Sequence, residues 1–163
     1  MWQIEDVIRA SGFDIEKLKE SYINRFTFND ENERRTVIEW YDSLIEMMIS
    51  EQIKEKGHLQ INKNVMYDLL EFHSLILKSN SNPAYNAKFI HILPLINQFR
   101  IKSEVNLSDI ELCFNFQYGI LMLKLKKEEI SSETLKTQEE IAKFMVLLAK
   151  DYHLYKTGEL DLE

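Results

Sequence analysis

Apolar residues lie on every side of one predicted helix, which runs from about residue 108 to residue 127. Ser108 and Glu111 have the spacing of a capping box, in which a hydroxyl and a carboxylate satisfy free amides of the first turn. A surface helix would carry one apolar stripe, so this segment predicts a buried central helix that other helices surround. Its apolar residues are Ile110, Leu112, Cys113, Phe114, Phe116, Tyr118, Ile120, Leu121, Met122, Leu123 and Leu125.

Apolar residues at helical spacing predict further helices before this segment. The first includes Trp2 and ends near Gly12, and the second begins after Asp14, a residue type that caps helices. The third begins after Asp30 and is expected to stop at Gly57. The fourth then starts in the short polar connector that follows, where Asn62 or Asn64 can cap it.

One more helix is predicted before the central helix and one after it. Asn82 followed by Pro83 is a cap and then a residue without an amide hydrogen, which is typical of a helix start. Pro94 lies inside that helix and should bend it or end it. The last helix is expected from Ser131 to Gly158.

These patterns predict an all-α fold, a bundle of six or seven helices packed mainly up and down around residues 108–127. Only four Gly and two Pro occur in 163 residues, which favours long helices. We find no repeat, low-complexity tract or long linker, so we expect one helical domain over residues 1–163. The acidic end, residues 157–163, is expected to be a flexible tail.

Cysteine usage and the first residues indicate a reducing compartment. Cys113 is the only cysteine, so no internal disulfide can form, and the first residues lack the basic and apolar regions of a secretory signal. Polar residues and a glycine interrupt the apolar run at 108–127, which therefore falls short of a membrane span. We expect a cytoplasmic protein without a membrane partner.

The net charge of −7 argues against nucleic acid as a partner, because affinity for nucleic acid comes from cationic side chains. The charge is distributed unevenly along the chain. Residues 54–103 carry seven basic and three acidic side chains, a net charge of +4, whereas the segments before and after are acidic. An anionic ligand is therefore expected in the middle third, if the chain binds one.

The polar connector at residues 56–64 is the best candidate for such a ligand. Cationic and amide side chains lie there beside a helix N-terminus, which attracts anions. A solvated turn that caps two helices explains Gly57 and Asn62 equally directly, and we favour the turn over the ligand site. The candidate ligand-binding residues are Lys56, His58, Asn62, Lys63 and Asn64.

Three further polar residues are candidates for buried positions: His73, on an apolar helix face, and Asn115 and Gln117, in the central helix. His73 has no carboxylate three or four residues away, so we favour a hydrogen-bonded core histidine over a metal ligand. Glu55 and His58 form the only Glu-x-x-His pair, and the intervening glycine spoils its helical geometry. We expect no metal site, no cofactor and no nucleophilic cysteine.

Three motifs resemble a bacterial family of all-helical domains of unknown function. They are WQIEDVIRA from Trp2, EKGHLQINKN from Glu55, and ELCF from Glu111 followed by Tyr118-Gly119. The likeness covers nearly the whole chain, and the second motif is its most specific part. In other members a short segment precedes the match to Trp2, so the chain is expected to begin inside the family's first helix. The resemblance implies no activity and supplies no catalytic residue.

Two functional hypotheses follow from the sequence. The first is a non-catalytic protein that associates with itself or with another protein, because no catalytic set is recognisable and Met47, Met48 and Ile49 extend the apolar face of the third helix. The second is a small-molecule or anion-binding protein, or an enzyme, with its site at residues 56–64. A metal-binding bundle is the weakest alternative.

Overall fold

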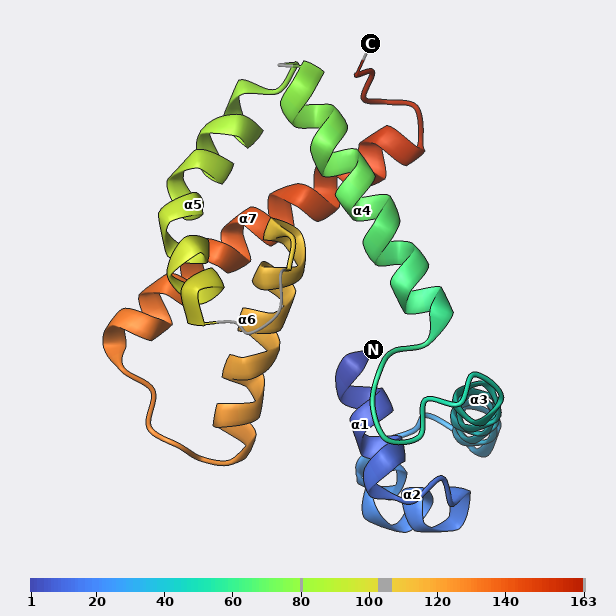
Figure 1. The fold of residues 1–163 in the computed structure, drawn as a ribbon. Coiled ribbons are helices and arrows are strands. Elements are labelled where there is room, and N and C mark those ends of the chain that lie inside the picture. The colour runs from blue at the N-terminus through green and yellow to red at the C-terminus, as the bar shows by residue number, and fades with distance from the viewer. Residues whose placement is uncertain (80, 103–106, 163) are drawn as a thin grey trace. The chain divides into compact units, whose positions relative to one another are not determined.

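The computed structural model describes residues 1–79, 81–102 and 107–162. These residues form seven α-helices, one short 3-10 helix and no strand (Figure 1), so the prediction of an all-α fold is confirmed. The chain divides into two compact units, residues 1–64 and residues 65–163, called here the first and the second unit. The single domain that the sequence suggested stays a prediction.

The first unit contains three α-helices, one 3-10 helix and the start of a fourth α-helix. They are α1 (Trp2–Ala10), α2 (Ile15–Ser21), the 3-10 helix η1 (Ile23–Arg25), α3 (Glu31–Ser50) and the first residues of α4 (Gln60–Ser79). Its core is formed by buried apolar side chains from all of these except α4, together with the connector before it. The core residues are Ile8, Leu18, Ile23, Tyr41, Leu44, Ile45, Met48, Ile53 and Leu59.

Helix α3 ends seven residues before Gly57, so the prediction that Gly57 stops it is wrong. Gln52 adopts a left-handed conformation with φ of 57°, and the Ile53 amide donates to the Met48 carbonyl at 3.1 Å. This turn closes the helix and directs the Ile53 side chain into the core, where it is buried. Burial of one apolar side chain thus overrides the usual preference for glycine at such a position.

The second unit contains the rest of α4 with α5 (Pro83–Lys102), α6 (Asp109–Leu125) and α7 (Ser132–Lys156). Helices α5, α6 and α7 each contact the other two (Figure 1), and the Phe72 ring of α4 lies 5.6 Å from that of Tyr152 on α7. The core residues are Leu69, Phe72, Ile76, Tyr85, Phe89, Ile92, Ile96, Ile110, Leu112, Cys113, Phe116, Ile120, Ile141, Phe144 and Leu148.

Several predicted helix starts are confirmed in atomic detail. Asn82 Oδ1 accepts from the Tyr85 amide at 3.0 Å, and the Ser108 and Glu111 pair forms the expected capping box. Helix α5 continues beyond Pro94, so the alternative that this proline ends the helix is wrong. The buried α6 side chains belong to the core of the second unit, and a central place for α6 in the whole chain stays a prediction.

The chain turns back after α7. Gly158 has φ of 75°, and the Glu159 amide donates to the Leu154 carbonyl at 2.8 Å. Leu160 and Leu162 are then half-buried against the core of the second unit. The flexibility expected of residues 157–163 stays a prediction. Within the described part of the chain, none of the helices combines the length and the apolar character that crossing a bilayer requires.

Candidate functional site

The carboxylate of Glu5 on α1 is completely buried and holds the polar connector in place. Its Oε1 accepts from the Leu59 amide at 3.0 Å and from Asn62 Nδ2 at 2.7 Å. Its Oε2 lies 2.5 Å from Nδ1 of His58. With the carboxylate ionised, as inferred from its two other donors, Oε2 can only accept, and the donor is then Nδ1 of His58. Three donors from the connector and α4 therefore converge on one carboxylate of α1.

These bonds cap the start of α4. Helix N-termini leave backbone amides without partners and carry a partial positive charge, so carboxylates stabilise them. Glu5 takes the Leu59 amide, and Glu51, next to the end of α3, takes the Gln60 amide at 2.7 Å. The prediction that Asn62 or Asn64 caps this helix is wrong, because side chains distant in sequence perform that role.

Trp2 and Arg9 extend the contact between α1 and the connector. The Trp2 ring stacks on the His58 ring at a centroid distance of 4.7 Å and an interplanar angle of 19°. The Arg9 guanidinium donates to the Ile53 and Gly57 carbonyls. Trp2, Glu5 and Arg9 are spaced to share one face of α1. The first two motifs of the family resemblance are therefore the two sides of one contact.

The five predicted ligand-binding residues are placed unequally. His58 and Asn62 bind Glu5, and Asn64 Oδ1 accepts from Gln60 Nε2 at 2.8 Å. Lys56 is exposed and Lys63 is half-buried, and neither makes an ion pair within the described residues. The structure thus brings His58 and Asn62 together, around the carboxylate of Glu5. Sequence reasoning missed Glu5, whose only signal was a charge on the Trp2 and Arg9 face.

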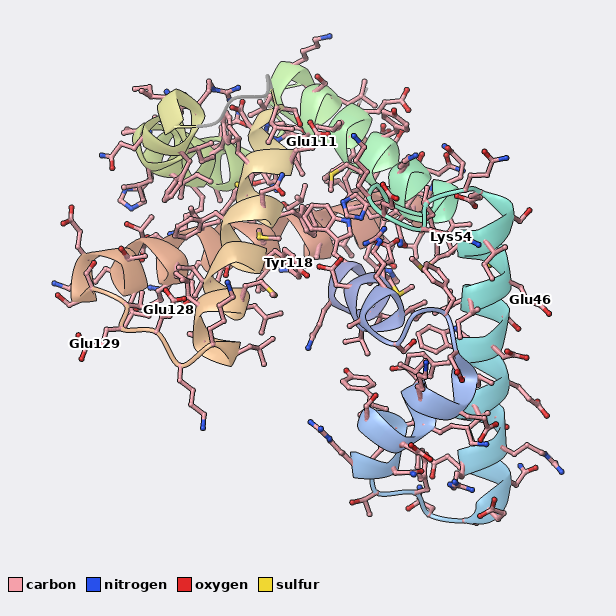
Figure 2. The ribbon with its side chains drawn as sticks, turned by 60° about the horizontal axis from the view of Figure 1, so that its bottom comes forward. Glu46, Lys54, Glu111, Tyr118, Glu128 and Glu129 are labelled. Atoms are coloured by element: carbon pink, nitrogen blue, oxygen red, sulfur yellow. The ribbon has the colours of Figure 1, made fainter. Side chains whose placement is uncertain are left out.

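A shallow cleft lies beside the connector. It has a volume of about 460 Å³ and is lined by Ile49, Gln52, Lys54, Glu55 and Lys56. Lys54 (Figure 2) and Lys56 are both exposed and form no ion pair with a described residue. Glu55 adds an acidic side chain to the same lining, so the cleft presents two cationic groups and one carboxylate.

The three predicted buried polar residues differ in their surroundings. His73 is buried, and its Nδ1 lies 2.7 Å from the Tyr85 hydroxyl. Asn115 is exposed, so its predicted burial is wrong, and its Nδ2 donates to the Glu111 carbonyl at 3.0 Å. Gln117 is half-buried and donates from Nε2 to the Gln138 carbonyl at 2.9 Å. Each of these side chains has a partner within its own unit.

The chemistry of Cys113 is that of a core residue. Burial raises the pKa of its thiol to about 12, so the reactive thiolate is scarce at neutral pH. In residues 1–79, 81–102 and 107–162, no three His, Cys, Asp or Glu side chains gather closely enough to hold a metal ion.

A groove of about 620 Å³ lies along α6. Phe99, Leu107, Leu112, Phe116 and Leu123 supply most of its apolar lining, and Asn115 is at its edge. Residues 103–106, between Phe99 and Leu107, lie outside the described part of the chain.

The outer face of α5 carries an apolar surface that no described residue of its own unit covers. Ile90 and Ile101 are 66% and 86% exposed, and Ala87, Pro94 and Asn97 between or beside them are also exposed. At 3.6 residues per turn these five residues form one stripe, called here the α5 stripe, of about 21 Å. It contains no charged residue, and the opposite face of α5 is in the core. A helix that is apolar on both faces is expected to be covered on both.

Replacing Glu5 with Gln tests the contact between α1 and the connector. The change keeps the shape but removes the charge that three donors share, so we expect the free energy of unfolding to fall by about 2 kcal/mol. Glu46→Gln is the matched control, because Glu46 is exposed on α3 and points away from α1 and α2 (Figure 2). It should change stability by less than about 0.5 kcal/mol. Equal stability of both variants in urea unfolding would contradict the structure.

The pH dependence of stability tests the environment of His73. Burial lowers the pKa of His73, so the unfolded chain binds a proton more tightly than the folded one. This group's contribution to stability is therefore complete above an unfolded pKa of about 6.5 and is lost as the pH falls below it. Between pH 7 and pH 5, the free energy of unfolding measured in urea should fall less for His73→Gln than for the wild type. Parallel curves would show that His73 is solvated.

Comparison with known proteins identifies the family. No curated protein and no solved structure matches the chain. A family model matches residues 1–159, which confirms the resemblance that the sequence indicated. The description of this family gives no activity, ligand or partner. The chain belongs to the family described as a domain of unknown function, DUF4924.

Proposed function

We propose that this chain is a non-catalytic cytoplasmic protein that acts by associating with itself or with another protein. The observation that carries the proposal is the α5 stripe, where Ile90 and Ile101 are mostly exposed on a face without charge. Exposed apolar side chains that continue along one face mark interaction surfaces more often than scattered ones do.

The surroundings of His58, Asn62 and Cys113 support the same proposal. His58 and Asn62, which are the strongest candidates for binding chemistry, already bind the carboxylate of Glu5. Cys113 is buried as a protonated thiol in the core of the second unit. These three side chains thus have roles within the fold, whereas no described residue of the second unit covers Ile90 and Ile101 on α5.

The part of α3 that the sequence suggested as an interaction surface contributes less. Met48 is in the core of the first unit and Met47 is half-buried, so only Ile49 of the three is exposed. An apolar residue that is exposed singly needs no partner to explain it. The α5 stripe is therefore the better surface for the proposed association.

A double variant tests the proposed function. We expect Ile90→Glu with Ile101→Glu to abolish recovery of any partner, including a second copy, after cross-linking in the source cells and affinity purification. Both side chains are exposed, so the fold should be retained, as far-ultraviolet circular dichroism will show. Val146→Glu is the matched control, because Val146 is 70% exposed on α7 and lies outside the stripe. Equal recovery with the wild type and the double variant would contradict the proposal.

A second candidate function is the binding of an anionic small molecule in the cleft beside the connector. Lys54 and Lys56 in its lining, which form no ion pair with a described residue, favour it. Titration with inorganic phosphate should shift the backbone amide signals of residues 49–56 in nuclear magnetic resonance spectra. Replacing both lysines with alanine should remove these shifts. Shifts that are absent in the wild type, or unchanged in the variant, would exclude this candidate.

A further inference from the structure

A small pocket of about 130 Å³ lies between α4 and α7 in the second unit. We infer that this pocket binds the ammonium group of a small organic amine, in competition with the side chain of Lys156. The pocket shares no lining residue with the cleft beside the connector or with the α5 stripe, so its test is independent of the proposed function. Its polar and aromatic residues are Asp68, Glu71 and Phe72 of α4 and Tyr152, Tyr155 and Lys156 of α7.

Three aromatic rings form one wall of the pocket. Phe72 is buried, and its ring lies 5.6 Å from the Tyr152 ring and 5.4 Å from the Tyr155 ring. The Tyr152 hydroxyl donates to Oδ2 of Asp68 at 3.2 Å, which holds a carboxylate at the edge of this wall. An aromatic face attracts a cation through its quadrupole, and a carboxylate attracts it through its charge. The two interactions therefore favour the same kind of ligand.

Lys156 shows which group this arrangement attracts. Its Nζ lies over the Tyr152 ring, 5.7 Å from the centroid, and 3.8 Å from Oδ2 of Asp68. Both distances are near the upper limit for their kind of contact, and the Lys156 side chain is 56% exposed. Glu5, by contrast, is completely buried with three close donors. The lysine thus occupies its position loosely and leaves the pocket open, so a second ammonium group can replace it.

Charge and size restrict the ligand to a small cation. Asp68 and Glu71 give the lining two carboxylates against the one cation of Lys156, and Glu71 forms no ion pair with a described residue. The volume equals that of about four water molecules, so a head group enters but a drug-sized ligand does not.

A divalent metal ion fits this pocket less well than an ammonium group does. Calcium and magnesium require about six oxygen ligands, whereas the described lining supplies two carboxylates and two tyrosine hydroxyls. In the described ranges, no three acidic, His or Cys side chains gather closely enough to hold a metal ion. An organic ammonium ion needs fewer oxygen ligands, because its carbon atoms contact the aromatic rings.

Titration of the full chain with n-butylammonium chloride tests the inference, because this ion reproduces the side chain of lysine. In nuclear magnetic resonance spectra it should shift the backbone amide signals of residues 68–72 and 152–156 to saturation. Potassium chloride at equal concentration is the control for ionic strength and should not reproduce these shifts. Lys156→Ala should bind butylammonium about two- to fivefold more tightly, because the exposed internal competitor is gone. Lys150→Ala, exposed on α7 outside the pocket, should bind it as the wild type does.

Removal of a carboxylate should have the opposite effect. Asp68→Asn and Glu71→Gln should each weaken butylammonium binding at least about threefold. Glu129→Gln, exposed on the turn before α7 (Figure 2), is the matched control and should leave binding unchanged. The gain of affinity in Lys156→Ala cannot result from misfolding, so the test remains valid if a carboxylate variant unfolds. Shifts that do not saturate, that potassium chloride reproduces, or whose half-saturation Lys156→Ala does not lower overturn the inference.

Discussion

The burial of the Glu5 carboxylate is the constraint on which the first unit depends. An ionised carboxylate removed from water is costly unless hydrogen bonds replace its hydration. Here the Leu59 amide, Asn62 and His58 supply three donors, and Trp2 covers the His58 ring. Because these donors come from the connector and from α4, the charge can be buried only when α1 and the connector are correctly placed.

The polar side chains that looked suited to ligand binding are hydrogen-bonded within the fold, whereas an apolar face of α5 is exposed. The EKGHLQINKN motif has the composition of an anion-binding loop, yet two of its side chains bind an anion that belongs to the chain. In the second unit, His73 likewise has its partner in Tyr85. The outer face of α5 differs from both, because Ile90 and Ile101 contribute nothing to the core and remain exposed. The association proposed above would account for this exposed surface.

Local signals in the sequence predicted the helices well. Caps such as Asn82 and the Ser108 and Glu111 pair act within three residues, so their effect can be read directly from the sequence. The end of α3 could not be read in this way, since the left-handed conformation of Gln52 follows from the burial of Ile53. The cap of α4 was missed because Glu5 lies 54 residues before Leu59. Asn115 was misplaced because an all-apolar helix gives no indication of which face is outermost.

Amide hydrogen exchange of Leu59 tests most directly whether the chain's own carboxylate holds the connector. This amide precedes the first turn of α4 and donates to Glu5 alone among the described groups. In the wild type without any added ligand, this amide should exchange as slowly as the core amides of α1 and α3. Exchange at the rate of an open loop, or protection that develops only when an anion is added, would contradict it.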